Sequence, residues 1–193
     1  MGVLPSPPLT TAQYLELDRC SEHHSEFHDG EMFPIETSGL NHGRIGINLT
    51  KAIDSGLENR PCQLIGSTVR VRIPNSIRYA YPDLIVACGA LEFEDQKRDT
   101  LLNPTVLIEI LSPSTEGFDR GEKFALYRTI PSFQEYVLVS QNRVLVERFR
   151  RQNEHNWHFE EVTDLDASLR IESLGIEIPA REIYARIEIP TGS

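Results

Sequence analysis

Long hydrophobic runs are absent from this chain of 193 residues. No stretch approaches the roughly 18 consecutive apolar residues of a membrane-spanning helix, and the first residues lack the basic start and apolar centre of a secretory signal. The contents of apolar residues, 39%, and charged residues, 25%, are ordinary for a globular protein. We therefore expect a cytoplasmic protein without a membrane partner, with a disordered Pro-rich leader over residues 1–9 and a single domain over residues 10–190.

Cysteine is also scarce. Cys20, Cys62 and Cys88 are odd in number, are widely spaced and form no C-x-x-C motif. Such a pattern encodes neither a disulfide framework nor a zinc site. We expect three reduced and mostly buried thiols.

Positive charge is in deficit, because the net charge is −10. The field of such a protein repels polyanions, so non-specific coating of nucleic acid is not expected. A nucleic-acid role would need local basic patches. Arginines do gather, over residues 70–78 and 143–151, but arginines in strands are usually solvated, and we expect the same of these.

Hydrophobic periodicity and turn signals predict an α+β fold with an α/β-like core. Helices are expected near residues 10–18, 42–55, 118–128 and 180–186. Strands are expected at 25–29, 31–35, 62–66, 69–73, 81–86, 105–111, 135–139, 144–149 and 157–162, followed by short alternating runs up to residue 178. Asp29-Gly30 predicts a hairpin turn between the first two strands. Strand, helix and strand over 105–139 indicate a crossover connection within a mixed sheet.

Two acidic residues stand in apolar surroundings. Glu109 interrupts the run from Thr105 to Leu111, and Asp83 opens an apolar strand directly after Pro82. An unpartnered buried carboxylate costs several kcal/mol, so such a residue is usually tied to a cation, a hydrogen-bond network or a metal. Glu109 could instead face water on an edge strand, and Asp83 could be a turn residue. If the two strands are neighbours, mutual repulsion would favour a shared Mg2+ or Mn2+.

Asp119, Lys123 and Tyr127 recur at helical spacing and share one face of the predicted third helix. This spacing fits a surface salt bridge between Asp119 and Lys123. It also allows the helix to return over the carboxylates, where a lysine could orient water or stabilise charge on a phosphate. The neighbouring Arg120 and Arg128 are candidate phosphate contacts, or else solvated helix charges.

The order of these residues resembles a known family. Pro82-Asp83 is followed by the block Glu109-Ile-Leu-Ser-Pro-Ser-Thr115, then by Asp119, Lys123 and Tyr127, and then by Glu135-Tyr136. Upstream, Glu26-Phe-His-Asp-Gly30-Glu31 and His42 match the landmarks that precede the Pro-Asp strand. Over about residues 10–140 the chain resembles the Uma-two family of restriction-endonuclease-like proteins.

The resemblance implies a PD-(D/E)xK nuclease fold, a mixed sheet flanked by helices, in which Asp83 and Glu109 hold the metal. The lysine that usually follows the acidic residue by two positions would fall at Leu111, and Lys123 on the next helix is the matching position. Glu26 and His42 match family positions that could complete the metal or water site. His42 could equally cap a helix or lie in the core.

These observations favour a Mg2+-dependent endonuclease acting on DNA, in which Lys123 stabilises developing negative charge. Asp119 and Tyr127 are accessory candidates. Double-strand cutting would favour a homodimer, for which the C-terminal strands are a candidate surface unless they cover their own sheet. Two alternatives remain open: a nuclease-like module that binds nucleic acid or protein without turnover, and a hydrolase of small phosphate esters.

Overall fold

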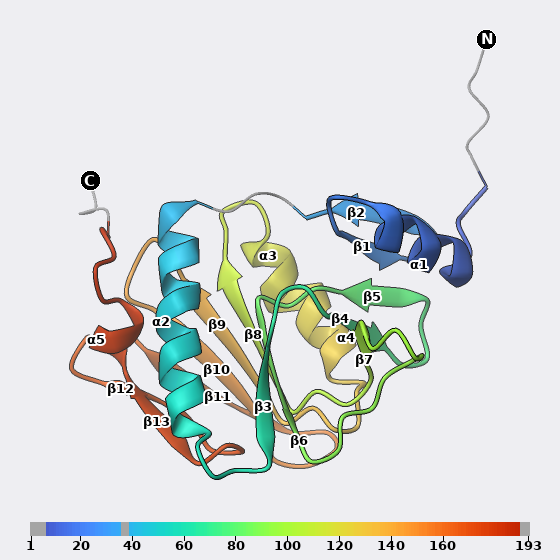
Figure 1. The fold of residues 1–193 in the computed structure, drawn as a ribbon. Coiled ribbons are helices and arrows are strands. Elements are labelled where there is room, and N and C mark those ends of the chain that lie inside the picture. Colours follow the sequence, from blue (N-terminus) through green and yellow to red (C-terminus); the bar gives the residue numbers. More distant parts are fainter. Residues whose placement is uncertain (1–6, 36–38, 190–193) are drawn as a thin grey trace.

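The computed structural model describes residues 7–35 and 39–189 (Figure 1). The leader predicted over residues 1–9 lies mostly outside this part of the chain. Of its described residues, Leu9 donates its backbone N–H to the carbonyl of Gly30 at 2.9 Å. No helix in the described ranges is long and apolar enough to cross a membrane.

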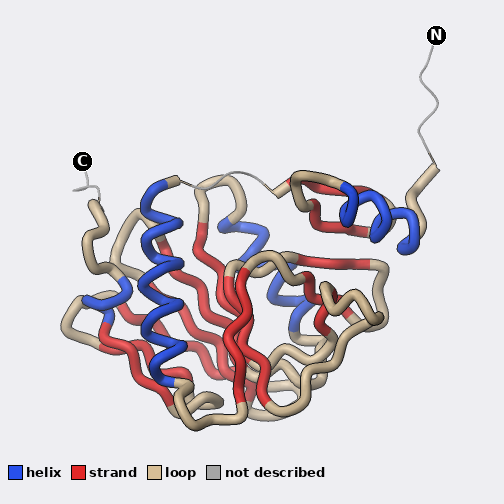
Figure 2. The backbone as a smooth tube through the Cα atoms, viewed as in Figure 1, coloured by secondary structure: helices blue, strands red, loops and turns tan. Residues whose placement is uncertain are grey.

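The main sheet has six strands in the order β11-β10-β9-β8-β6-β3. They span Trp157–Val162, Val146–Arg151, Glu135–Ser140, Val106–Leu111, Leu84–Cys88 and Cys62–Gly66, respectively. Only the central pair, β8 and β9, is parallel. The connection between these two strands carries the predicted third helix, so the expected crossover is confirmed. Among the described residues, more of the elements are strands than helices (Figure 2).

Alternation along β8 directs side chains to two apolar cores. Val106, Ile108 and Ile110 pack on the face covered by α2 (Leu40–Gly56), whose Ile45 and Leu49 are fully buried there. The same core contains residues of the hairpin β12 (Ser168–Ile171) and β13 (Ile176–Pro179) and of α5 (Ala180–Ile183). These C-terminal elements therefore cover their own sheet, which removes the reason for treating their apolar residues as a dimer surface.

The opposite face of the main sheet packs against α3 (Glu116–Phe118), η1 (Asp119–Lys123) and α4 (Phe124–Tyr127), which follow one another without a break. Figure 1 shows α2 and this helical segment on either side of the sheet. One α-helix over 118–128 was predicted. The helix instead begins two residues earlier and includes a π-helical turn at η1, a widening that periodicity at 3.6 residues does not reveal.

A second sheet of five strands has the order β2-β1-β5-β4-β7. The strands span Glu31–Pro34, Ser25–His28, Arg78–Ala80, Arg70–Ile73 and Thr100–Leu101, respectively. The helix α1 (Thr11–Cys20), capped by Thr10, packs on this sheet through Tyr14. The predicted hairpin at Asp29-Gly30 is confirmed, with both turn residues at positive φ. Leu17 of α1 is exposed.

The strand predicted over 81–86 is present as β6, but it begins later, at Leu84, and ends at Cys88. The chain leaves the second sheet after Ala80 and enters the main sheet at Leu84, so β5 and β6 belong to different sheets. Pro82 has no N–H to donate to a strand ladder, which explains the break. Asp83 consequently lies at the junction of the two sheets.

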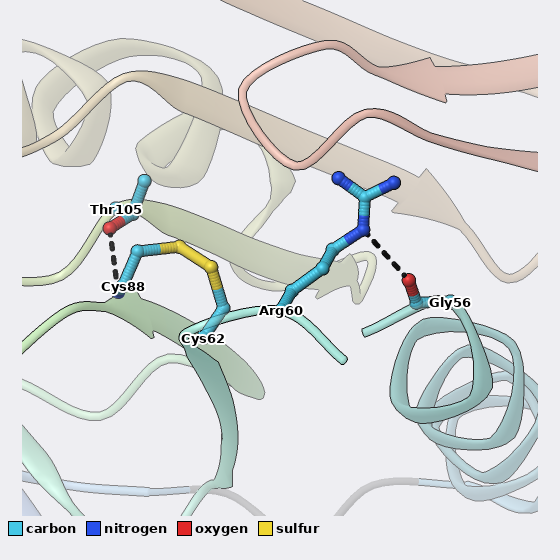
Figure 3. The surroundings of a disulfide bond; sticks show 5 residues. All are labelled: Gly56, Arg60, Cys62, Cys88 and Thr105. Carbon is cyan, nitrogen blue, oxygen red and sulfur yellow. Dashed lines mark hydrogen bonds between the residues drawn. A yellow bond between two sulfur atoms is a disulfide. The ribbon is translucent and has the colours of Figure 1, made fainter. Parts of the chain in front are cut away.

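The prediction for the cysteines was wrong. Cys62 on β3 and Cys88 on β6 are directly opposite and form a disulfide, with Cα atoms 3.9 Å apart (Figure 3). The backbone N–H of Cys88 donates to the Thr105 hydroxyl in the same region. The remaining thiol, Cys20, is exposed rather than buried. The pairing depends on strand register, which cysteine spacing does not contain.

The prediction that the arginine groups are solvated was wrong for Arg70 and Arg148, which are both buried. Arg70 is only 1% exposed and contacts Asp18 at 2.7 Å and Asp99 at 2.6 Å. Arg148 is also buried and pairs with Glu160. Both guanidinium groups are accommodated because carboxylates from other elements neutralise them.

Candidate functional site

Asp83 and Glu109 come from neighbouring strands. The antiparallel register of β6 and β8 pairs Leu84 with Ile108, so its continuation by one residue places Asp83 opposite Glu109. Asp83 is anchored to β8 because its Oδ2 accepts the backbone N–H of Ile110 at 2.7 Å. Its Oδ1 lies 3.3 Å from Nε2 of His42, in the first turns of α2. Asp83 is therefore held between the sheet junction and α2.

Glu109 lies inside the sheet, only 4% exposed, on the central strand β8. The alternative of a water-facing edge strand was wrong. The Oε1 atom of Glu109 lies 3.0 Å from Nζ of Lys123 and accepts a hydrogen bond from the Tyr127 hydroxyl at 2.9 Å. Two of the residues predicted from the helix face thus converge on the predicted strand carboxylate.

Lys123 contacts three carboxylates. Besides Glu109, its Nζ lies 3.1 Å from Oε1 of Glu26 and 3.5 Å from Oδ1 of Asp119. Lys123 is 7% exposed and Asp119 is 3% exposed. The i,i+4 pair is real but buried, so the alternative of a surface salt bridge was wrong.

The N-terminal hairpin contributes Glu26 to this cluster. Its Oε1 accepts the backbone N–H of Tyr81 at 3.2 Å, and its Oε2 lies 3.4 Å from Nε2 of His28. The His28 ring in turn stacks on Phe118 of α3, with ring centroids 5.5 Å apart. His28 was not among the residues predicted for the site. Its spacing of two from Glu26 on a strand, which puts both side chains on one face, was the available signal.

The cluster is rich in carboxyl groups. Glu26, Glu109 and Asp119 contact the single ammonium of Lys123, and Asp83 is close enough to Glu109 to affect its pKa. Burial raises the pKa of Glu109 well above its ordinary value; Lys123 opposes this rise, whereas the three other carboxylates add to it. Burial also raises the pKa of Asp119, against the effect of Lys123.

Glu26 behaves differently. Burial alone would raise its pKa, but Lys123, His28 and the Tyr81 N–H outweigh burial and lower it to about 2. Burial would likewise lower the pKa of Lys123, but Glu109, Glu26 and Asp119 raise it well above its ordinary value. Lys123 is therefore a protonated ammonium and Glu26 an ionised carboxylate near neutral pH.

The residues present fit a hard divalent cation. Asp83 and Glu109 are oxygen donors at paired positions of neighbouring strands. Burial is the main cause of the raised pKa of Glu109 and repulsion from the other carboxylates adds to it; a cation beside them would relieve that repulsion. Within residues 7–35 and 39–189, no group of three His, Cys, Asp or Glu residues could hold a metal ion. The protein would thus supply two carboxylates, with water and phosphate oxygens completing the shell, as is common for Mg2+.

The two candidate phosphate contacts do not join this cluster. Arg120 forms ion pairs with Glu147 on β10 at 2.7 Å and with Glu116 at 2.9 Å. Arg128 lies over the Phe124 ring, 5.1 Å from its centroid. Arg120 is accordingly bound to the sheet, and Arg128 covers an aromatic side chain.

Comparison with known proteins assigns the chain to a family. Residues 11–181 match the Uma2 (Uma-two) family model, described as "Putative restriction endonuclease". The chain belongs to the Uma2 family. The family resemblance found in the sequence is therefore confirmed.

Two similar proteins come from Synechocystis sp. The Uma2 chain is 33% identical over 176 residues to "Uncharacterized protein sll1609", covering 91% of this chain and 99% of that protein. It is 30% identical over 183 residues to "Uncharacterized protein slr1290", covering 93% of each. A crystal structure of "a putative nuclease belonging to DUF820" from Anabaena variabilis has a TM-score of 0.75 at 18% identity, covering 94% of this chain and 100% of that chain. The likeness confirms the predicted α+β, restriction-endonuclease-like fold.

Proposed function

We propose that this Uma2 protein is a metal-dependent endonuclease that hydrolyses phosphodiester bonds of DNA. The observation that carries the proposal is the buried Glu109, opposite Asp83 in the register of the sheet and in contact with Lys123. A buried, net negative group of this kind costs stability without a cation. A nuclease that binds a divalent metal ion would account for this cost, because the metal supplies the missing positive charge.

Asp83 and Glu109 would hold Mg2+ or Mn2+, which when bound supplies a Lewis acid for the phosphate and a more acidic water. Lys123 carries its positive charge next to Glu109, where it can stabilise negative charge that develops on the phosphate. Tyr127 fixes the Glu109 carboxylate through its hydroxyl. The His42 ring lies against Asp83, with Nε2 3.3 Å from Oδ1.

Lys123 is proposed to take the place of the usual strand lysine. Leu111, where that lysine would stand, is buried in the apolar core of the helical face. Lys123 reaches the strand carboxylate from η1 instead, at 3.0 Å. The helical segment thus provides the cation that the strand lacks.

Cleavage of plasmid and single-stranded DNA tests the proposal. The wild type is compared with Asp83→Asn and Glu109→Gln in Mg2+, Mn2+ or EDTA, and Asp54→Asn and Glu58→Gln serve as exposed controls on and after the far end of α2. We expect metal-dependent cutting that falls at least about 100-fold in both site variants and persists in both controls. Cutting that survives EDTA, or survives in both site variants, would contradict it.

The binding module without turnover is the competing proposal. It predicts that DNA binding persists in Asp83→Asn and Glu109→Gln and that no metal-dependent cutting occurs. A homodimer, a DNA rather than RNA substrate and a cytoplasmic location stay predictions from the sequence.

A further inference from the structure

A pocket of about 460 Å3 adjoins Asp83 on the α2 face of the main sheet. Leu84 and Ile110 from the sheet and Ile47 from α2 give it apolar walls. His42, which contacts Asp83, and Lys51 both line it. Their separation of nine positions corresponds to about 13.5 Å along the helix axis. The pocket therefore extends from the proposed metal centre along α2.

Two glycines of α2 leave this space open. A Cβ atom at Gly43 would meet no atom within 4 Å, and one at Gly46 would lie 3.5 Å from Cδ1 of Ile110. Glycine is a poor residue for a helix interior, yet both of these line the pocket. A larger side chain at Gly43 would project into it.

The polar groups of the pocket suit a nucleotide. Lys51 is exposed and has no ion-pair partner among the residues that the structure describes, in contrast to the fully paired Lys123. The hydroxyls of Thr50 and Ser67 also line the pocket and can donate or accept hydrogen bonds. Apolar walls with a few polar groups and a free ammonium are complementary to a base with its phosphate.

We propose that this pocket binds one nucleoside of the substrate strand, unstacked from its neighbours and adjacent to the phosphate at Asp83, while Lys51 contacts the next phosphate. The inference rests on the proposed nuclease function and adds a substrate class to it. Because an unpaired base leaves the stack more easily than a paired one, the preferred substrate is single-stranded or locally unpaired DNA.

Binding of thymidine 5′-monophosphate to the full chain in EDTA tests the pocket without metal or cleavage. Two-dimensional NMR titrations compare the wild type with Gly43→Leu, which fills the pocket, and Lys51→Ala, which removes its ammonium. Ser55→Leu on α2 and Lys97→Ala in a loop are matched, exposed controls outside the pocket. Thymidine and inorganic phosphate are titrated separately, and thermal melting verifies that each variant is folded.

We expect saturable binding of the nucleotide that Gly43→Leu weakens at least tenfold. Lys51→Ala should weaken nucleotide binding about fivefold and leave thymidine binding unchanged. Neither control variant should alter the dissociation constant of the nucleotide or of thymidine. The pocket is refuted if the wild type does not bind the nucleotide, if Gly43→Leu binds it equally well, or if inorganic phosphate binds as tightly as the nucleotide.

The test separates this inference from the proposed function. If the protein binds the nucleotide as expected but never cuts DNA, the pocket proposal is supported and the nuclease proposal is contradicted. If the protein cuts DNA through Asp83 and Glu109 but does not bind the nucleotide as expected, the nuclease proposal is supported and the pocket proposal is contradicted. Lys51 is exposed, so Lys51→Ala remains informative even if Gly43→Leu does not fold.

Discussion

Replacement of Lys123 by methionine should destabilise the protein strongly at neutral pH. The change removes the ammonium that lies 3.0 to 3.5 Å from oxygens of Glu109, Glu26 and Asp119. Methionine retains most of the side-chain volume but leaves these buried carboxylates without their cation. Removal of one partner of a buried ion pair typically costs about 3–5 kcal/mol.

The pKa of Glu26 provides an independent magnitude. In the folded protein this pKa is lowered from 4.5 to about 2, and burial alone would have raised it. A lowered folded-state pKa contributes stability that is fully present above pH 4.5 and is lost as the pH falls toward 2. The difference corresponds to about 3 kcal/mol, of which Lys123 is the main source.

Urea unfolding between pH 3 and pH 8 measures the effect. We expect Lys123→Met to lose about 3 kcal/mol of unfolding free energy at pH 7. The deficit should shrink as the pH falls below 4.5, because the wild type then loses the stability that the lowered pKa of Glu26 provides. Lys97→Met, at an exposed lysine, is the matched control and should lie within about 0.5 kcal/mol of the wild type throughout. A deficit at Lys123 that is absent at pH 7, or equally large at pH 3, would refute the reasoning.

Three further changes have predicted effects on stability. The disulfide between Cys62 and Cys88 closes a loop with a separation of 26 residues. Its reduction should lower the free energy of unfolding by about 3.5 kcal/mol. Urea unfolding with and without dithiothreitol measures this, and unchanged stability would contradict it. Gly46→Ala should raise stability by up to about 1 kcal/mol in the same assay, because alanine favours the helix; a loss would show that the added methyl group clashes. Arg70→Met removes the arginine partner of the buried Asp18 and should lower stability by about 3–5 kcal/mol by thermal melting, whereas a gain would show that the pair is unfavourable.

Local patterns predicted the elements that carry the site. The four-residue spacing of Ile45, Leu49 and Ile53 identified α2, because all three face the same core. The apolar run around Glu109 identified β8, since a strand in the centre of a sheet is apolar on both faces. Burial of a charge in such a run is the reason that Glu109 stood out.

Long-range pairing could not be predicted from these patterns. The contact between Glu26 and Lys123 joins β1 to η1, and the disulfide joins strands separated by a loop and a second sheet. Hydrophobic periodicity reports burial but not the identity of the neighbour. Glu26 was therefore available only through the family resemblance.

The buried arginines and the π-helical turn were not predicted, for a different reason. Arg70 lies in a strand whose neighbours alternate as in a solvated edge, but its guanidinium is neutralised by Asp18 and Asp99 from other elements. The widening at Asp119–Lys123 contains Gly121, but a single glycine inside a helical pattern does not distinguish a π-helical turn from an α-helix. Both features depend on the assembled structure.

Divalent-metal binding is the most direct test of the proposed function. Calorimetric titration of Mn2+ into the wild type, Asp83→Asn, Glu109→Gln and the control Asp54→Asn measures it without DNA. We predict one site per chain, lost in both site variants and unchanged in the control. No binding to the wild type, or binding that survives both Asp83→Asn and Glu109→Gln, would contradict a metal centre at these two carboxylates.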